Sequence, residues 1–364
     1  MTTPAAASKT AAILGVTGKT FTMNILNGLA IGTVVSLIPG ALLGELLKAI
    51  IPAVPSLQAL YNVTLLCNSI MGAVVGVIIG IFFGFTPIQT ASLGLAVMIG
   101  GGAFQGLGPE GKGLVLAGTG DIINMGLVAT LGAFLILALG NKFKAYTILV
   151  IPLISVAIAG GVGILTLPYV KMITKAVGAG VAQLTGLQPL LMAILLAMVF
   201  AALIVSPITT VGIALAISLA GIGSGAANLG ITACGFGFAI AGWKVNSHGT
   251  SLAHFIGSPK ISMGNVLAKP KILLPVLCSA AVSGAVGALL NIQGTPMSAG
   301  FGISGLIGPL NHLNLVEGGW SATNLLLTLV AFIVVPVAAG FFFTWLFQNV
   351  LKIVKPEDYF VNVQ

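Results

Sequence analysis

Ten side chains in this sequence could bind a polar solute, and most of them lie in three short polar segments. These segments cover residues 119–124, 244–260 and 311–319, each next to an apolar run. Their amides and imidazoles could exchange hydrogen bonds with a hydroxylated solute, and a carboxylate or histidine could carry a proton. The predicted solute-binding residues are Gln105, Asp121, Asn124, Asn228, Asn246, His248, His254, Asn311, His312 and Glu317.

Asp121 and the three histidines also have a simpler interpretation. Asp121 precedes an apolar helix, where a carboxylate commonly caps the first turn and faces the positive end of the helix dipole. The three histidines could be ordinary residues of solvated loops. The sequence leaves the binding role and these structural roles open.

The same residues predict no catalytic site in this chain. No His, Cys, Asp and Glu cluster has metal-ligand spacing, and no Ser/His/Asp order resembles a nucleophilic triad. Cys67, Cys234 and Cys278 lie in apolar, small-residue runs, which we interpret as helix packing. We therefore expect neither a metal ion nor another cofactor. All 14 basic residues are lysine, and without arginine a planar bidentate clamp for a strongly anionic solute is absent.

The composition predicts the elements that position these residues. Of 364 residues, 57% are hydrophobic and 5% are charged, whereas soluble domains carry roughly 25% charged residues. The fold class is therefore an all-α polytopic membrane protein with about ten transmembrane helices. The predicted spans are Met23–Leu43, Val63–Gly84, Pro87–Ala103, Ile122–Leu139, Tyr146–Leu167, Leu187–Val205, Pro207–Gly221, Leu229–Trp243, Ile272–Ile292 and Ala322–Leu351.

The predicted organisation is one transmembrane transport domain over residues 22–351, between an N-terminal tail (1–21) and a C-terminal tail (352–364). The N-terminus lacks a signal-like cleavage region, so we expect the first span to be retained. With this end in the cytoplasm, ten lysines, Lys260 among them, lie inside and four lie outside, as the positive-inside rule favours. The lysines are scattered and form no basic stripe of the kind that binds nucleic acid, so we expect the lipid bilayer and not nucleic acid as a partner.

Three Ser/Thr-Pro breaks, at Pro87, Pro207 and Pro296, begin similar segments. The repeat-like units cover about 63–108, 187–230 and 272–311, and Gln105 and Asn228 occupy matching ends of the first two. Proline ends a helix, and the segments that follow are short and glycine-rich, so we expect broken or re-entrant helices, including 296–310. Paired interrupted segments are a pointer to a transport site, although tight loops between ordinary spans would give the same pattern.

The sequence resembles the EIIC-like membrane proteins of the bacterial sugar phosphotransferase system, in the branch that includes the perfringolysin regulator. The resemblance is carried by the stretch from Asn27 to Lys48, the Gly-Thr-Gly-Asp121-Ile-Ile-Asn124 turn, and the Ser247-His-Gly-Thr and Gly257-Ser-Pro-Lys segments. It implies a dimeric permease of the bacterial inner membrane that carries a sugar inward while soluble EIIA and EIIB proteins phosphorylate it. The phosphorylatable Cys or His of such systems belongs to those separate domains.

Three hypotheses for the function follow. The first is an EIIC-like permease that moves a small polar solute, most simply a sugar. The second is a secondary transporter coupled to protons or sodium without phosphotransfer, and the third is a membrane sensor derived from a permease. A permease should phosphorylate its solute during uptake, a coupled transporter should deliver it unmodified, and a sensor should bind without net flux.

Overall fold

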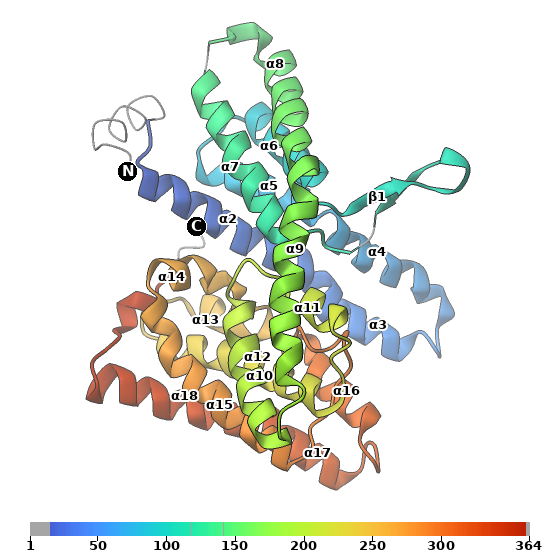
Figure 1. Cartoon of the computed structure of the whole chain (residues 1–364), viewed down its shortest axis with the longest axis vertical. Helices are drawn as coiled ribbons and strands as arrows, with labels where there is room; N and C mark the ends of the chain where they lie inside the picture. Colours follow the sequence, from blue (N-terminus) through green and yellow to red (C-terminus); the bar gives the residue numbers. More distant parts are fainter. Residues whose placement is uncertain (1–14, 117, 141, 362–364) are drawn as a thin grey trace. The chain divides into compact units, whose positions relative to one another are not determined.

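The computed structural model describes residues 15–116, 118–140 and 142–361, with the backbone alone at positions 41, 42, 45, 49, 105, 109 and 145. The chain is 76% helical, and the predicted all-α polytopic membrane class is confirmed. Within the described residues, a hairpin of β1 (Phe104–Leu107) and β2 (Leu114–Leu116) is the one sheet. The chain divides into two compact units, Met1–Gly40 with Ala59–Met172 and Ala41–Gln58 with Ile173–Gln364 (Figure 1).

The first unit consists of apolar helices, with the β1–β2 hairpin in the connection from α6 to α7. In this unit α5 packs between α2 and α6, and α6 also contacts α7 and α8. A Cβ at Gly28 of α2 would lie 2.3 Å from Ile79 Cγ1, so α2 and α5 approach closely only because that position is glycine. Its elements are α2 (Gly18–Ile38), α4 (Gln58–Ser69), α5 (Met71–Phe82), α6 (Pro87–Gly100), α7 (Ile122–Leu139), α8 (Thr147–Ile154) and the start of α9 (Gly161–Leu184).

The start of α6 shows how the first Thr-Pro break forms. The Thr86 hydroxyl accepts a hydrogen bond from Gln89 N, and the Gln89 side chain accepts one from Thr86 N, which makes a capping box. Pro87 occupies the first helical position, where its missing N–H costs no helical hydrogen bond. The chain therefore leaves α5 at Phe82 and begins a new helix at Pro87.

The second unit is organised around α12, in which 94% of the apolar stretch is buried. α10, α15 and α18 pack against it. Its helices are α3 (Gly44–Ile50), α10 (Pro189–Ile204), α11 (Thr210–Ala216), α12 (Gly221–Ala241), α13 (His248–Ile256), α14 (Met263–Ala268), α15 (Leu274–Leu289), α16 (Ile307–Leu315), α17 (Ala322–Leu329) and α18 (Val335–Trp345), together with the end of α9.

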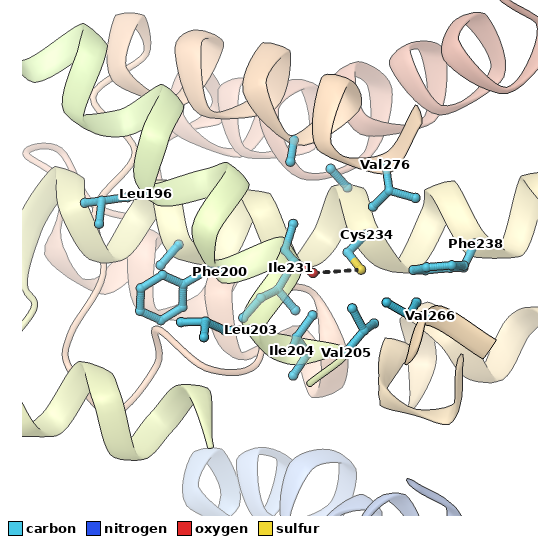
Figure 2. Packing of buried hydrophobic residues seen from close by; sticks show 14 of the residues in the cluster. Leu196, Phe200, Leu203, Ile204, Val205, Ile231, Cys234, Phe238, Val266 and Val276 are labelled. Atoms are coloured by element: carbon cyan, nitrogen blue, oxygen red, sulfur yellow. Dashed lines mark hydrogen bonds between the residues drawn. The ribbon is translucent and has the colours of Figure 1, made fainter. Parts of the chain in front are cut away.

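The apolar core of this unit lies between α10, α12 and α15 (Figure 2). Phe200 and Phe238 are fully enclosed in it, and Cys234 donates to the carbonyl oxygen of Ala201 at 3.5 Å. A Cβ at Gly230 would lie 2.0 Å from the Ala197 carbonyl oxygen. The glycine content of α12 thus lets α10 pack directly against its backbone.

The spans differ in detail from the predicted ones. Within the described residues, six helices are long and apolar enough to cross a membrane. The pair α4 and α5, bent by 53°, would be a seventh span if the two helices cross together. α6 and α10 are shorter apolar helices. The predicted span Pro207–Gly221 contains only the seven residues of α11, which at 1.5 Å per residue cannot cross a bilayer. The predicted span Tyr146–Leu167 instead continues as helix to Leu184.

Candidate functional site

An irregular segment between α15 and α16, residues 290–306, passes beside the first half of α12. Gly221 and Gly294 exchange both backbone hydrogen bonds, at 2.9 and 3.1 Å. A Cβ at Gly225 would lie 1.9 Å from the Ile292 carbonyl oxygen, so glycine is needed where the two backbones meet. The third break, which contains Pro296, is therefore held against α12 by main-chain contacts.

Two side chains of α12, Ser224 and Asn228, also bind this segment. The Ser224 hydroxyl donates to the Thr295 carbonyl oxygen at 2.7 Å. The Asn228 amide donates to the Ser298 hydroxyl at 3.2 Å, and its oxygen accepts from Gly302 N at 3.0 Å. Asn228 is fully buried, so its polar atoms are satisfied by the broken segment instead of by water.

Two residues of α16, Asn311 and His312, also contact the segment. The Thr295 hydroxyl donates to Asn311 Oδ1 at 2.9 Å, and His312 Nδ1 accepts from Gln293 N at 3.1 Å. Burial lowers the pKa of His312, and because Nδ1 accepts, the neutral ring carries its proton on Nε2. We call the six residues Ser224, Asn228, Thr295, Ser298, Asn311 and His312 the α12 polar cluster.

The α12 polar cluster contains amides, hydroxyls and an imidazole but no charged side chain. Such groups can donate to and accept from the hydroxyls of a neutral solute. Thr295 and Ser298 lie on the irregular segment, and the other four residues lie on α12 and α16 beside it. Such non-helical backbone is tolerated in a membrane protein if it is buried in protein or lines a cavity. Of the predicted site residues, the structure brings Asn228, Asn311 and His312 together here.

Asp121 and Asn124 lie in the first unit and have structural contacts there. Asp121 caps α7 by accepting from Asn124 N at 3.0 Å. The Asn124 amide donates to the carbonyl oxygens of Gly100 and Gly163, and its oxygen accepts from the Thr166 hydroxyl. Asn124 therefore ties the start of α7 to the end of α6 and to α9, and its binding role stays a prediction.

The two histidines of the 244–260 segment have different surroundings. His254 is buried, with Nδ1 near the Thr250 carbonyl oxygen at 3.0 Å and Nε2 bonded to the Ser262 hydroxyl at 2.8 Å. His248 is exposed and stacks on Trp243, with ring centroids 5.1 Å apart. Neither belongs to the α12 polar cluster, and their roles in binding stay predictions.

Asn246 fastens the C-terminal tail to the turn after α12 within the second unit. Its amide donates to the Tyr359 carbonyl oxygen at 2.9 Å, and its oxygen accepts from Val361 N at 2.8 Å.

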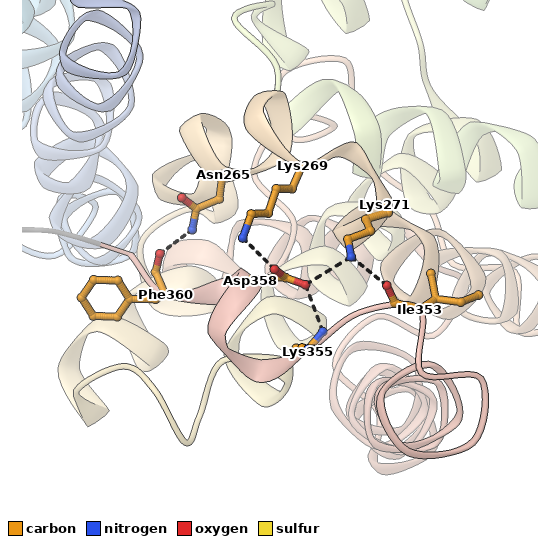
Figure 3. A network of polar contacts seen from close by, with 7 residues as sticks. All are labelled: Asn265, Lys269, Lys271, Ile353, Lys355, Asp358 and Phe360. Atoms are coloured by element: carbon orange, nitrogen blue, oxygen red, sulfur yellow. Dashed lines mark hydrogen bonds and ion pairs between the residues drawn. The ribbon is translucent and has the colours of Figure 1, made fainter. Parts of the chain in front are cut away.

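Figure 3 shows the rest of this docking, which is centred on Asp358. Its carboxylate lies 2.7 Å from Lys269 Nζ and 3.6 Å from Lys271 Nζ and accepts from Lys355 N. Burial raises the pKa of Asp358, but these hydrogen bonds and charges outweigh it and hold that pKa below its ordinary value.

The remaining predicted site residues lie elsewhere. Glu317 is exposed in the turn before α17, where its carbonyl oxygen accepts from the Asn324 amide at 2.9 Å. The Gln105 side chain lies outside the described residues. Pro207 lies between the end of α10 and the start of α11. Among the described residues, no three His, Cys, Asp or Glu side chains gather as a metal ion would require.

Sequence reasoning missed the hydroxyl half of the cluster and one buried cation. Ser224, Asn228 and Thr232 recur every four residues, and this polar stripe on an otherwise apolar, glycine-rich helix could have revealed Ser224. Lys260, predicted to lie in a cytoplasmic loop, is only 3% exposed. Its position after Gly-Ser-Pro is typical of a surface turn, so no local signal indicates burial.

The chain matches the family model described as "Phosphotransferase system, EIIC" over residues 23–361. The matched range runs from α2 to the docked C-terminal tail and includes both units. No curated protein and no solved structure matches the chain.

Proposed function

The chain belongs to the phosphotransferase system EIIC family, and from this premise we propose that the solute it carries is a sugar. The family makes it a multi-pass membrane permease component that works with soluble proteins of such a system. In that arrangement this chain supplies the path and the binding site, and a soluble partner supplies the phosphoryl group. We further propose a homodimer in the bacterial inner membrane with a cytoplasmic N-terminus, as the family resemblance and the lysine distribution favour.

The single observation that supports a sugar is the uncharged α12 polar cluster. A sugar presents several hydroxyls that both donate and accept, and the amides of Asn228 and Asn311 can do both as well. Their present partners, the Ser298 and Thr295 hydroxyls, are the groups that sugar hydroxyls would replace. The solute site we propose is therefore the third break and the face of α12 beside it.

The proposal is tested with membrane vesicles that contain the full chain and are supplied with a panel of labelled sugars. The assay is run with and without phosphoenolpyruvate and a cytosolic extract of the source bacterium. We expect the label to enter as a sugar phosphate, only when phosphoenolpyruvate is present. Unmodified solute that is lost when ionophores collapse the ion gradients would support the coupled transporter instead, and binding without flux would support the sensor.

A matched pair on α16 tests the location of the site. Asn311→Ala removes the acceptor of the Thr295 hydroxyl inside the cluster. Asn314→Ala changes an exposed residue of the same helix, whose partner is Trp320. Sugar affinity should fall at least tenfold in the first variant and stay unchanged in the second. Equal affinities in both would remove Asn311 from the site.

A further inference from the structure

Lys260 is a buried cation whose partners are backbone oxygens. It lies in the turn between α13 and α14, outside the spanning helices, and its side chain is only 3% exposed. Its Nζ donates to the Ser206 carbonyl oxygen at 2.5 Å and to the Ile208 carbonyl oxygen at 3.3 Å. Within the described part of the chain, no carboxylate forms an ion pair with it.

The two acceptor carbonyls belong to the second Ser-Pro break. α10 ends at Ile204 and α11 begins at Thr210, so the chain between them has no helical donors for these oxygens. Pro207 also removes one backbone N–H, and the Ser206 hydroxyl is already used by Leu203 O and Ile208 N. The ammonium of Lys260 thus supplies the positive charge for oxygens that the break leaves unpaired.

The other titratable groups around Lys260 have partners of their own. Cys234 Sγ donates to the Ala201 carbonyl oxygen, and His254 Nε2 is bonded to the Ser262 hydroxyl. A buried charge is costly unless hydrogen bonds offset its lost hydration, and here two backbone carbonyl oxygens supply them. Carbonyl oxygens at the end of an interrupted helix are also the ligands with which transporters hold a coupling sodium ion.

We propose that the Ser206 and Ile208 carbonyl oxygens form a monovalent-cation site that the tethered ammonium of Lys260 occupies whenever the lysine is protonated. Because the lysine fills this position, transport needs no sodium or potassium ion there. The inference rests on the permease assignment and not on the identity of the solute. The contact of Lys260 with the two carbonyl oxygens would thus distinguish this chain from an ion-coupled transporter.

The test compares two substitutions of different size in the purified full chain. Lys260→Ala removes the charge and leaves room for a free ion, whereas Lys260→Met removes the charge but fills the space. Burial lowers the pKa of Lys260 to about 7, so unfolding is measured at about pH 6, where the wild-type ammonium stays protonated. The salts are ammonium, sodium and choline chloride at equal ionic strength.

We expect both variants to unfold at a lower temperature than the wild type in choline chloride. Ammonium or sodium should restore at least half of the loss in Lys260→Ala and none in Lys260→Met. Lys269→Ala, which changes an exposed lysine of the same unit, should not respond to the choice of cation. Equal midpoints of Lys260→Ala in all three salts would overturn the cation site.

A second measurement needs no variant to fold. At about pH 6, where Lys260 is protonated, the midpoint of the wild type and its solute uptake should be the same in sodium and in choline chloride. Stabilisation or faster uptake of the wild type in sodium would overturn the proposal. This result is independent of whether the solute is phosphorylated, so it distinguishes failure of the cation site from failure of the proposed sugar permease.

Discussion

Replacing Asn228 by leucine should destabilise the second unit, because the amide has two partners from a segment about 70 residues further along the chain. Leucine has the same number and branching of side-chain heavy atoms, so the change removes hydrogen bonds without opening a cavity. The main loss is the acceptor of Gly302 N, a buried donor that leucine cannot satisfy. Ser298 keeps its bonds to Thr295.

The magnitude follows from these two contacts. An unsatisfied buried donor costs about 1–3 kcal/mol, and the net loss of the second hydrogen bond adds about 1 kcal/mol. Burial of the leucine side chain offsets part of this cost. We expect about 2–3 kcal/mol, which is roughly a 30- to 150-fold change in the folding equilibrium at tenfold per 1.4 kcal/mol.

Cys234, six residues along the same helix and fully buried, provides the readout. In a background with Cys67→Ala and Cys278→Ala, a thiol-reactive dye labels the chain only when Cys234 becomes accessible. Labelling during heating should begin several degrees lower in Asn228→Leu than in the background. Asn314→Leu, at an exposed position of α16, serves as the control. The reasoning is refuted if both variants label at the same temperature.

Three further predictions concern packing and the tail. Gly230→Ala should cost about 1–3 kcal/mol because its Cβ would lie 2.0 Å from the Ala197 carbonyl oxygen, whereas Gly180→Ala, with open space around the new methyl group, should leave stability equal or slightly raised in the same thermal assay. Asn124→Leu should lower the unfolding temperature and make the buried start of α7 accessible to protease, since three hydrogen bonds to neighbouring elements are lost. Because the folded-state pKa of Asp358 lies below its ordinary value, its contribution to tail docking is complete above the unfolded pKa of about 3.9 and is lost as the pH falls through the lower folded value. Hydrogen exchange at 359–361 should therefore stay slow at neutral pH in the wild type and become fast there in Asp358→Asn, and slow exchange in that variant would contradict the ion-pair argument.

Short-range patterns in the sequence are enough to place two helix starts. The start of α6 follows from Thr86, Pro87 and Gln89, three residues whose capping contacts lie within one turn. The cap of α7 follows from Asp121 in the same way. Both depend on neighbours in the chain, and hydropathy alone was enough for the membrane class.

Contacts between distant parts of the chain were not predictable in this way. The predicted span that begins at Leu229 omits the first two turns of α12, because Ser224 and Asn228 lower the local hydropathy although their partners bury them. The acceptors of Lys260 lie 54 and 52 residues earlier in the chain. Only the folded arrangement reveals that this lysine is enclosed.

The docked C-terminal tail is held largely through its main chain. Asn246, Asn265 and Lys271 bind backbone atoms of Tyr359, Val361, Phe360 and Ile353, so these contacts do not depend on the side chains at those four positions. Substitutions at the exposed positions 353 and 360 should therefore be tolerated as long as Asp358 and the path of the backbone are kept. For protein engineering, the tail is a fixed anchor that accepts changes at its exposed positions, and a reporter fused beyond Val361 would start from a defined point beside the 242–247 turn.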